Sequence, residues 1–130
     1  MAIHLVKGGR AGVPSELRTA TFTGTVWGDP VLAETDGVTI NSVAFAPGAR
    51  THWHSHDGGQ VLVVTSGAGR IYDRGGDGGA ITTGDVVFIP PGVDHWHGAA
   101  ADSHLVHLAI SLQGHDWLEP VSNEDYGRGS

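Results

Sequence analysis

Short apolar segments separated by turn residues make up most of the chain between residues 20 and 113. They are rich in β-branched and aromatic residues, and groups such as "APGA", "RGGDGG" and "PPGVD" stand between them, which is typical of strands joined by tight turns. The segments are ATFTGTVW, VTINSVAFA, QVLVVTS, GRIYD, DVVFIP and SHLVHLAIS. Because no amphipathic helix separates them, the pattern predicts an all-β fold, a sandwich or barrel of the jelly-roll kind.

The same pattern divides the chain into three parts. Residues 1–19 are rich in glycine and are expected to form an N-terminal arm, and residues 20–113 form the barrel. Residues 114–130 are polar, and we expect a C-terminal tail there, a short turn followed by disorder. A chain of 130 residues can bury one core, so a single domain is expected.

Composition and charge narrow the possible partners. The net charge of −7 repels nucleic acids and anionic membranes. No apolar run is long enough for a signal peptide or a membrane span. We therefore expect a cytoplasmic protein that acts on a small molecule. Because the chain has no cysteine, any metal must be held by nitrogen and oxygen donors.

Seven of the nine histidines lie between residues 52 and 107. Side chains alternate between the two faces of a strand, so His52, His54 and His56 are expected on one face. His95 and His97 share a face in the same way. An isolated histidine is usually a surface residue or a hydrogen-bonded core residue. Two such clusters in one β domain instead favour metal binding.

The remaining histidines follow the same alternation. The face that carries His107 also carries Leu105, Ala109 and Ser111. This mixture of histidine and small or apolar residues suits a pocket better than a sealed core. His104 falls on the opposite face and should point away from the site, and we expect surface positions for His4, His104 and His115.

Two ordered motifs resemble those of the small single-domain cupins. The first comprises Gly48, His54, His56, Gln60 and Gly67. The second comprises Gly84, Pro90, Gly92, His95 and Ala99. Within that family the chain is most similar to bacterial manganese-dependent cupins with hydroxynitrile lyase activity and to carboxymuconolactone-decarboxylase-associated cupins. The resemblance implies a cupin barrel over most of the chain.

The resemblance also implies a metal site. Its ligands would be His54, His56, Gln60 and His95, holding one divalent ion per chain, manganese first, with iron, nickel or zinc as alternatives. Gln60 stands where most cupins have glutamate, although the similar subgroup shares this glutamine, and Ala99 stands where most have asparagine. An amide keeps an oxygen donor but removes a negative charge, so the ion would be a stronger Lewis acid and a poorer stabiliser of high oxidation states.

The same likeness assigns positions around a substrate. His107 would stand beside the substrate as a general acid or base, and His97 and His52 are the next candidates. His52 has no reliable counterpart in the family and could equally sit at the barrel mouth. The pocket would be lined by Asn41, Val43 and Ser111.

These features favour a lyase of the hydroxynitrile lyase type, which acts on cyanohydrins or aldehydes by combined Lewis-acid and histidine catalysis. An iron-dependent dioxygenase and a non-catalytic module that binds a metal or small molecule remain alternatives, because a fold alone does not specify a reaction. Cupins commonly pair through strands, so we expect a homodimer or homotetramer.

Overall fold

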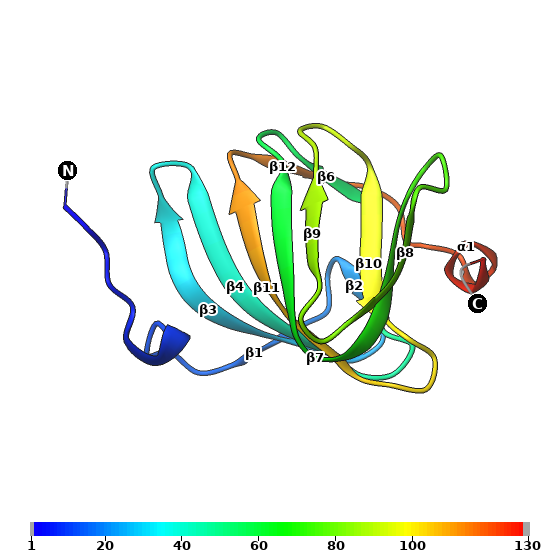
Figure 1. The fold of residues 1–130 in the computed structure, drawn as a ribbon, viewed down its shortest axis with the longest axis horizontal. Helices are drawn as coiled ribbons and strands as arrows, with labels where there is room; N and C mark the ends of the chain where they lie inside the picture. The colour runs from blue at the N-terminus through cyan, green and yellow to red at the C-terminus, as the bar shows by residue number, and fades with distance from the viewer. Residues whose placement is uncertain (1, 129–130) are drawn as a thin grey trace.

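The protein is all-β, as predicted, and its strands form two antiparallel sheets that curl around a common interior (Figure 1). The computed structural model describes residues 2–128. The first sheet contains β1 (Glu16–Arg18), β3 (Val26–Thr35), β4 (Val38–Phe45), β11 (Leu105–Leu112), the first half of β7 (Gln60–Asp73) and β9 (Val86–Ile89), paired in that order. The second contains β2 (Phe22–Thr23), β5 (Arg50–Thr51), β10 (His95–Ala99), the second half of β7 and β8 (Gly78–Thr82). Two further strands, β6 (His54–His56) and β12 (His115–Trp117), extend it beyond β10.

The strand β7 joins the two sheets. Its residues up to Gly67 pair with β11, and those from Ala68 onward pair with β8. Gly67 has a φ of 84° at this crossing, and a Cβ there would collide with the carbonyl oxygen of His104. Only glycine satisfies both conditions, because it tolerates positive φ and has no Cβ.

The barrel has one main core and a smaller cluster outside it. The main core consists of Val26, Val43, Phe45, Ala49, Leu62, Val64, Ile71, Ile81, Ile89, Ala99, Leu105 and Ala109. The smaller cluster comprises Trp53, Trp96 and Val121, with Tyr72 and Tyr126 packed against it. The first fills the space between the two sheets, and the second packs Val121 and Tyr126 of the C-terminal segment against the second sheet.

The C-terminal tail differs from the prediction. Residues 115–117 form β12, which pairs with β6, and α1 (Asn123–Gly127) follows it. The Arg50 guanidinium donates to the Val121 carbonyl at 2.9 Å and to Asn123 Oδ1 at 2.8 Å. These buried contacts hold the segment in place, so the prediction of disorder is wrong for residues 115–128. Residues 129–130 lie outside the described residues.

Part of the N-terminal arm also belongs to the first sheet. Its last residues form β1, which pairs with β3, and a short 3₁₀ helix, η1 (Lys7–Gly9), precedes it. The first residues stand away from the barrel, beside β3 (Figure 1). Within residues 2–128, the only helices are too short to cross a membrane.

Candidate metal centre and its cavity

Two of the predicted ligands come from the short strand β6. Its pairing with β10 places His54 opposite His95, and its pairing with β12 places His56 opposite His115. Alternation along this strand sends the His54 and His56 side chains to the same side. Both are buried.

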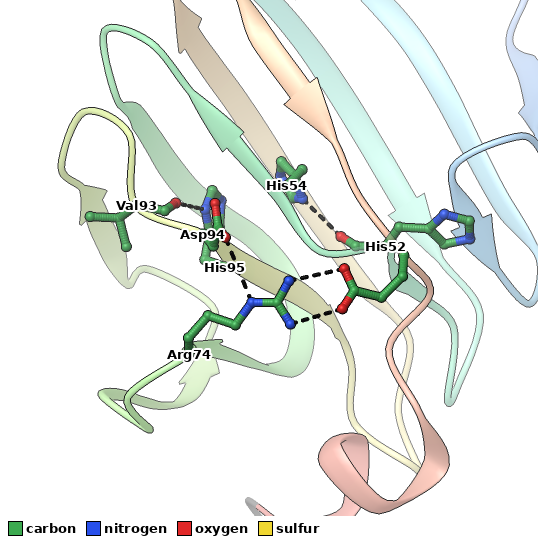
Figure 2. A network of polar contacts seen from close by, with 7 residues as sticks. His52, His54, Arg74, Val93, Asp94 and His95 are labelled. Carbon is green, nitrogen blue, oxygen red and sulfur yellow. Dashed lines mark hydrogen bonds and ion pairs between the residues drawn. The ribbon is translucent and has the colours of Figure 1, made fainter.

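His52 does not share that face, contrary to the prediction. The strand is interrupted between Thr51 and His54, where the His52 amide donates to the Thr21 carbonyl and Trp53 turns into the outer cluster. Figure 2 shows the His52 ring directed away from His54 and His95. Its backbone carbonyl, rather than its imidazole, contributes to the site.

Backbone carbonyls orient the rings of His54 and His95. Nδ1 of His54 lies 2.9 Å from the His52 carbonyl oxygen, and Nδ1 of His95 lies 2.9 Å from that of Val93 (Figure 2). A carbonyl only accepts, so each Nδ1 carries the proton and each neutral ring keeps a lone pair on Nε2. This is the usual way in which proteins prepare a histidine for a metal.

The free nitrogens of several histidines converge. One ring nitrogen from each of His54, His95 and His97 lies within 4.8 Å of the others. The His56 ring centre lies 5.1 Å from that of His54. Among the described residues, both ring nitrogens of His56 and Nε2 of His97 are buried without a hydrogen-bond partner. Such atoms are costly to bury unless they bind something.

Gln60 adds an oxygen donor whose position points to a cation. Its Nε2 donates to Ser111 Oγ at 3.0 Å, which turns Oε1 toward His95 Nε2, also at 3.0 Å. Burial lowers the pKa of His95, so its ring is neutral and has one N–H for two oxygen contacts, one at Val93 and one at Gln60. A cation bound by His95 Nε2 and Gln60 Oε1 removes this conflict, so the donor set fits a metal ion.

The electrostatics of the cluster suit metal binding at neutral pH. Burial, followed by the neighbouring His95, holds the pKa of His54 well below its usual range. Burial lowers the pKa of His56 to about 4. Burial and the adjacent His107 keep the pKa of His97 well below its usual value. These rings are therefore neutral at physiological pH, which is the state in which a histidine can bind a metal.

A cavity adjoins the cluster. Its inner part has a volume of about 90 Å³ and is lined by Arg18, Phe22, Asn41, Val43, Thr51, His54, His56, Gln60, His97, Ala109, Ser111 and Trp117. A wider outer part of about 480 Å³ shares Arg18, Phe22, Asn41, His56, Ser111 and Trp117 with it. The three predicted pocket residues, Asn41, Val43 and Ser111, all stand in the wall of the inner part. Among the described residues, no carboxylate lines either part.

Arg18 and Trp117 are two of the cavity residues that the sequence did not indicate. Arg18 comes from the arm, and the absence of a side chain at Gly28 makes room for it, because a Cβ there would lie 2.5 Å from Arg18 Nε. Trp117 comes from the tail, and its ring centre lies 4.5 Å from that of His54, with the two ring planes tilted by 31°. Both belong to strands of three residues, too short to show a periodic pattern.

His107 does not reach the cavity, which corrects its predicted position beside a substrate. It is fully buried behind His97, with its Nε2 3.0 Å from His97 Nδ1 and its ring 5.3 Å from that of Phe45. His97 is the member of this pair that lines the cavity. His104 points away, as expected, and contacts Ser66 at the surface. His4 and His115 are exposed, although His115 borders the outer cavity.

A β-barrel that holds a cluster of neutral histidines and a glutamine beside an internal cavity defines a small barrel whose side chains could bind a metal ion. The family model for the cupin domain matches residues 41–111, and the chain belongs to the cupin family. It is 48% identical to an (R)-mandelonitrile lyase from Granulicella tundricola over 113 residues, 82% of this chain and 86% of the relative.

Solved structures agree with this membership. A cupin-like protein from Thermotoga maritima superposes with a TM-score of 0.86 at 41% identity, over 92% of this chain and 96% of that one. A predicted oxalate decarboxylase from the same organism superposes with a TM-score of 0.73 at 20% identity, over 85% of this chain and 100% of that one. The second likeness concerns the fold alone.

Proposed function

We propose that this protein is a metal-dependent lyase of the hydroxynitrile lyase type, which splits a cyanohydrin into an aldehyde and hydrogen cyanide. The observation that carries the proposal is a cluster of neutral metal donors that faces a cavity. Among residues 2–128, Arg18 is the one charged residue that lines this cavity. Such a cavity favours a neutral substrate and an anionic leaving group. The similarity to a protein named (R)-mandelonitrile lyase supports it.

In this proposal His54, His56, Gln60 and His95 hold one divalent ion, with manganese as the expected metal. When bound, the ion would supply a Lewis acid that lowers the pKa of the substrate hydroxyl. The four side chains carry no negative charge, so none of them offsets the charge of the ion.

His97 serves as the proton acceptor. Its Nε2 is buried, has no hydrogen-bond partner among the described residues and belongs to the cavity wall. His97 Nδ1 lies 3.0 Å from His107 Nε2, and in this role its Nδ1–H would donate to His107 Nε2, so that Nε2 of His97 is left free to accept the proton. His107 is thus a positioning residue, which also stabilises the His97 imidazolium once the proton has moved.

In this proposal the remaining cavity residues contact the carbon skeleton of the substrate and stabilise the departing cyanide. The hydroxyl proton passes to His97, the carbon–nitrile bond breaks, and its electron pair leaves with cyanide, which then takes the proton from His97. Arg18 provides the positive charge for the departing cyanide. Phe22, Val43 and Trp117 form the apolar wall for the rest of the substrate.

The test is turnover of racemic mandelonitrile by the purified protein loaded with Mn²⁺, followed as benzaldehyde and cyanide release with chiral analysis of the remaining substrate. EDTA-treated protein and His54→Ala serve as controls and should show background rates. Release no faster than these controls with Mn²⁺, Fe²⁺, Ni²⁺ and Zn²⁺ in turn would refute the proposal. Oxygen uptake with Fe²⁺ in the absence of cyanide release would instead support an iron-dependent dioxygenase.

A further inference from the structure

The cavity widens away from the metal donors. Its inner part, lined by His54, His56 and Gln60 among others, has a volume of about 90 Å³, which is room for about three water molecules. The outer part has a volume of about 480 Å³, the size of a pocket for a complete small molecule. A substrate that reacts at the donors therefore places its reacting end in the inner part and the rest of its chain in the outer part.

The wall of the cavity becomes more polar toward the outer part. Alternate residues of β4 point inward, where Phe45 lies in the core and Val43 in the wall of the inner part. Asn41 lines both parts, and Thr39 lines the outer part. Thr39 pairs with Ser111 of β11, which also lines both parts. The outer part therefore offers hydrogen bonds where the core offers apolar contact.

The polar side chains of the outer part are neutral, apart from Arg18. Within residues 2–128, no hydrogen bond is made by the side chains of Thr19, Thr21, Thr39, Asn41, Gln113 and His115. Ser111 accepts a hydrogen bond from Gln60, which leaves its own hydroxyl proton to donate. Hydroxyl and amide groups both donate and accept, so this wall matches a ligand whose hydroxyl groups do the same.

Two aromatic side chains stand beside these polar groups. Phe22 and Trp117 line both parts of the cavity, and their ring centres lie 5.8 Å apart. Their apolar surfaces can pack against the C–H groups of a carbon chain whose hydroxyls bond to the polar wall. A phenyl ring in the outer part would instead cover the hydroxyl and amide groups without bonding to them, which is unfavourable.

We propose that the outer part is a subsite for a neutral, hydroxylated carbon chain, so that the preferred substrate is the cyanohydrin of a short sugar-like aldehyde. The inference rests on the lyase function proposed above for its reaction, in which the nitrile leaves as hydrogen cyanide and the hydroxyaldehyde remains. Binding to the subsite can be measured without that reaction.

Two cyanohydrins of equal length test the preference on manganese-loaded protein. The cyanohydrin of erythrose carries three hydroxyl groups that the cyanohydrin of butanal lacks. We expect kcat/KM for cyanide release to be higher for the erythrose compound by about tenfold or more, because each added hydroxyl gains a hydrogen bond in the subsite.

A double variant locates this preference in the outer part. Thr21→Val with Thr39→Val removes two hydroxyl groups of the subsite and should lower the ratio of the two kcat/KM values by about threefold to tenfold for each hydroxyl. Thr25→Val is the matched control, at an exposed threonine outside the cavity, and should keep the wild-type ratio. If circular dichroism shows that the double variant is unfolded, each single variant repeats the measurement. An unchanged ratio in a folded variant would overturn the proposal.

Binding without reaction separates this proposal from the lyase function. Calorimetry compares xylitol with 1,5-pentanediol, which has the same chain without the middle hydroxyls, and xylitol should bind about threefold more tightly or better. That preference without cyanide release from any cyanohydrin would support the subsite and refute the lyase. Release from mandelonitrile with no preference for the hydroxylated member of either pair would overturn the subsite alone. A preference for the cyanohydrin of succinic semialdehyde would also overturn it, because Arg18 would then bind an anionic chain.

Discussion

Gln60 shows how one amide decides the charge of the site. It is held between Ser111 and His95, so its oxygen faces the histidine nitrogens and its NH₂ group faces away. A carboxylate at this position would accept from Ser111 and could still bind the ion, but it would offset part of the positive charge. The set of metal donors is therefore neutral because residue 60 is an amide rather than a carboxylate.

We expect Gln60→Glu to retain full manganese content and to lower the lyase rate by roughly tenfold, because a less acidic ion lowers the pKa of the substrate hydroxyl less. Elemental analysis and turnover on the same preparation measure both effects. A faster lyase rate at equal metal content would contradict the charge argument.

His56 and His97 have different roles in the proposed site, and a pair of variants separates them. His56→Ala should lose stoichiometric manganese because it removes a ligand. His97→Ala should keep the metal and lower turnover by about 10² to 10⁴, the usual effect of losing a general acid or base. The reverse result would make His97 a ligand in a group with His54 and His95, whose nitrogens lie within 4.8 Å of its own.

At the scale of elements, one aromatic side chain adds to the arginine contacts that attach the C-terminal helix. The Tyr126 hydroxyl donates to the Ala99 carbonyl at 2.6 Å, and its ring lies 4.6 Å from both the Arg50 and the Arg70 guanidinium. This contact links α1 to β10, the strand that carries His95 and His97. The tail therefore supports the site from outside the barrel.

We expect Tyr126→Phe to lower the free energy of unfolding by about 1–2 kcal/mol, because the Ala99 carbonyl loses its hydrogen bond while the ring contacts remain. Tyr72→Phe is the control: Tyr72 packs against the same cluster, and its hydroxyl has no hydrogen bond within residues 2–128. Chemical denaturation of both variants measures the difference. Equal losses would mean that the hydroxyl contact does not stabilise the helix.

Long strands and spaced motifs could be predicted from the sequence, and three-residue strands could not. Alternation over β4, β10 and β11 gave the correct faces for Val43, His97 and Ser111. It failed at His52, where the chain leaves the strand, and it could not show that Arg18 and Trp117 reach the cavity. Those positions depend on pairing between distant segments, which local patterns do not record.

For the whole molecule, the buried histidines make the free energy of unfolding depend on pH. Burial lowers the pKa of both His56 and His107 to about 4 in the folded protein, whereas an unfolded histidine titrates near ~6.5. Between these values the unfolded chain binds protons that the folded chain does not. Stability should therefore be greatest above pH ~6.5 and should fall as the pH drops toward ~4.

We expect the melting temperature of EDTA-treated protein to decrease steadily over this range, with a shallower decrease in His107→Gln, which cannot be protonated. His104→Gln, at an exposed histidine, should follow the wild type. Calorimetry at several pH values measures the slopes. A wild-type melting temperature that is constant across the range would exclude this linkage.

Because side chains alternate along β4 and β11, mutations can change one face of these strands without changing the other. Odd-numbered positions such as Asn41, Val43 and Ser111 face the cavity, and even-numbered positions such as Ile40 and Ile110 lie on the outer surface of the sheet. Substitutions at odd positions can therefore change the cavity and leave the outer surface of the sheet unaltered. Inserting or deleting a single residue in either strand would exchange the two faces at once. Changes that preserve length should therefore dominate the divergence of these strands among descendants of this protein.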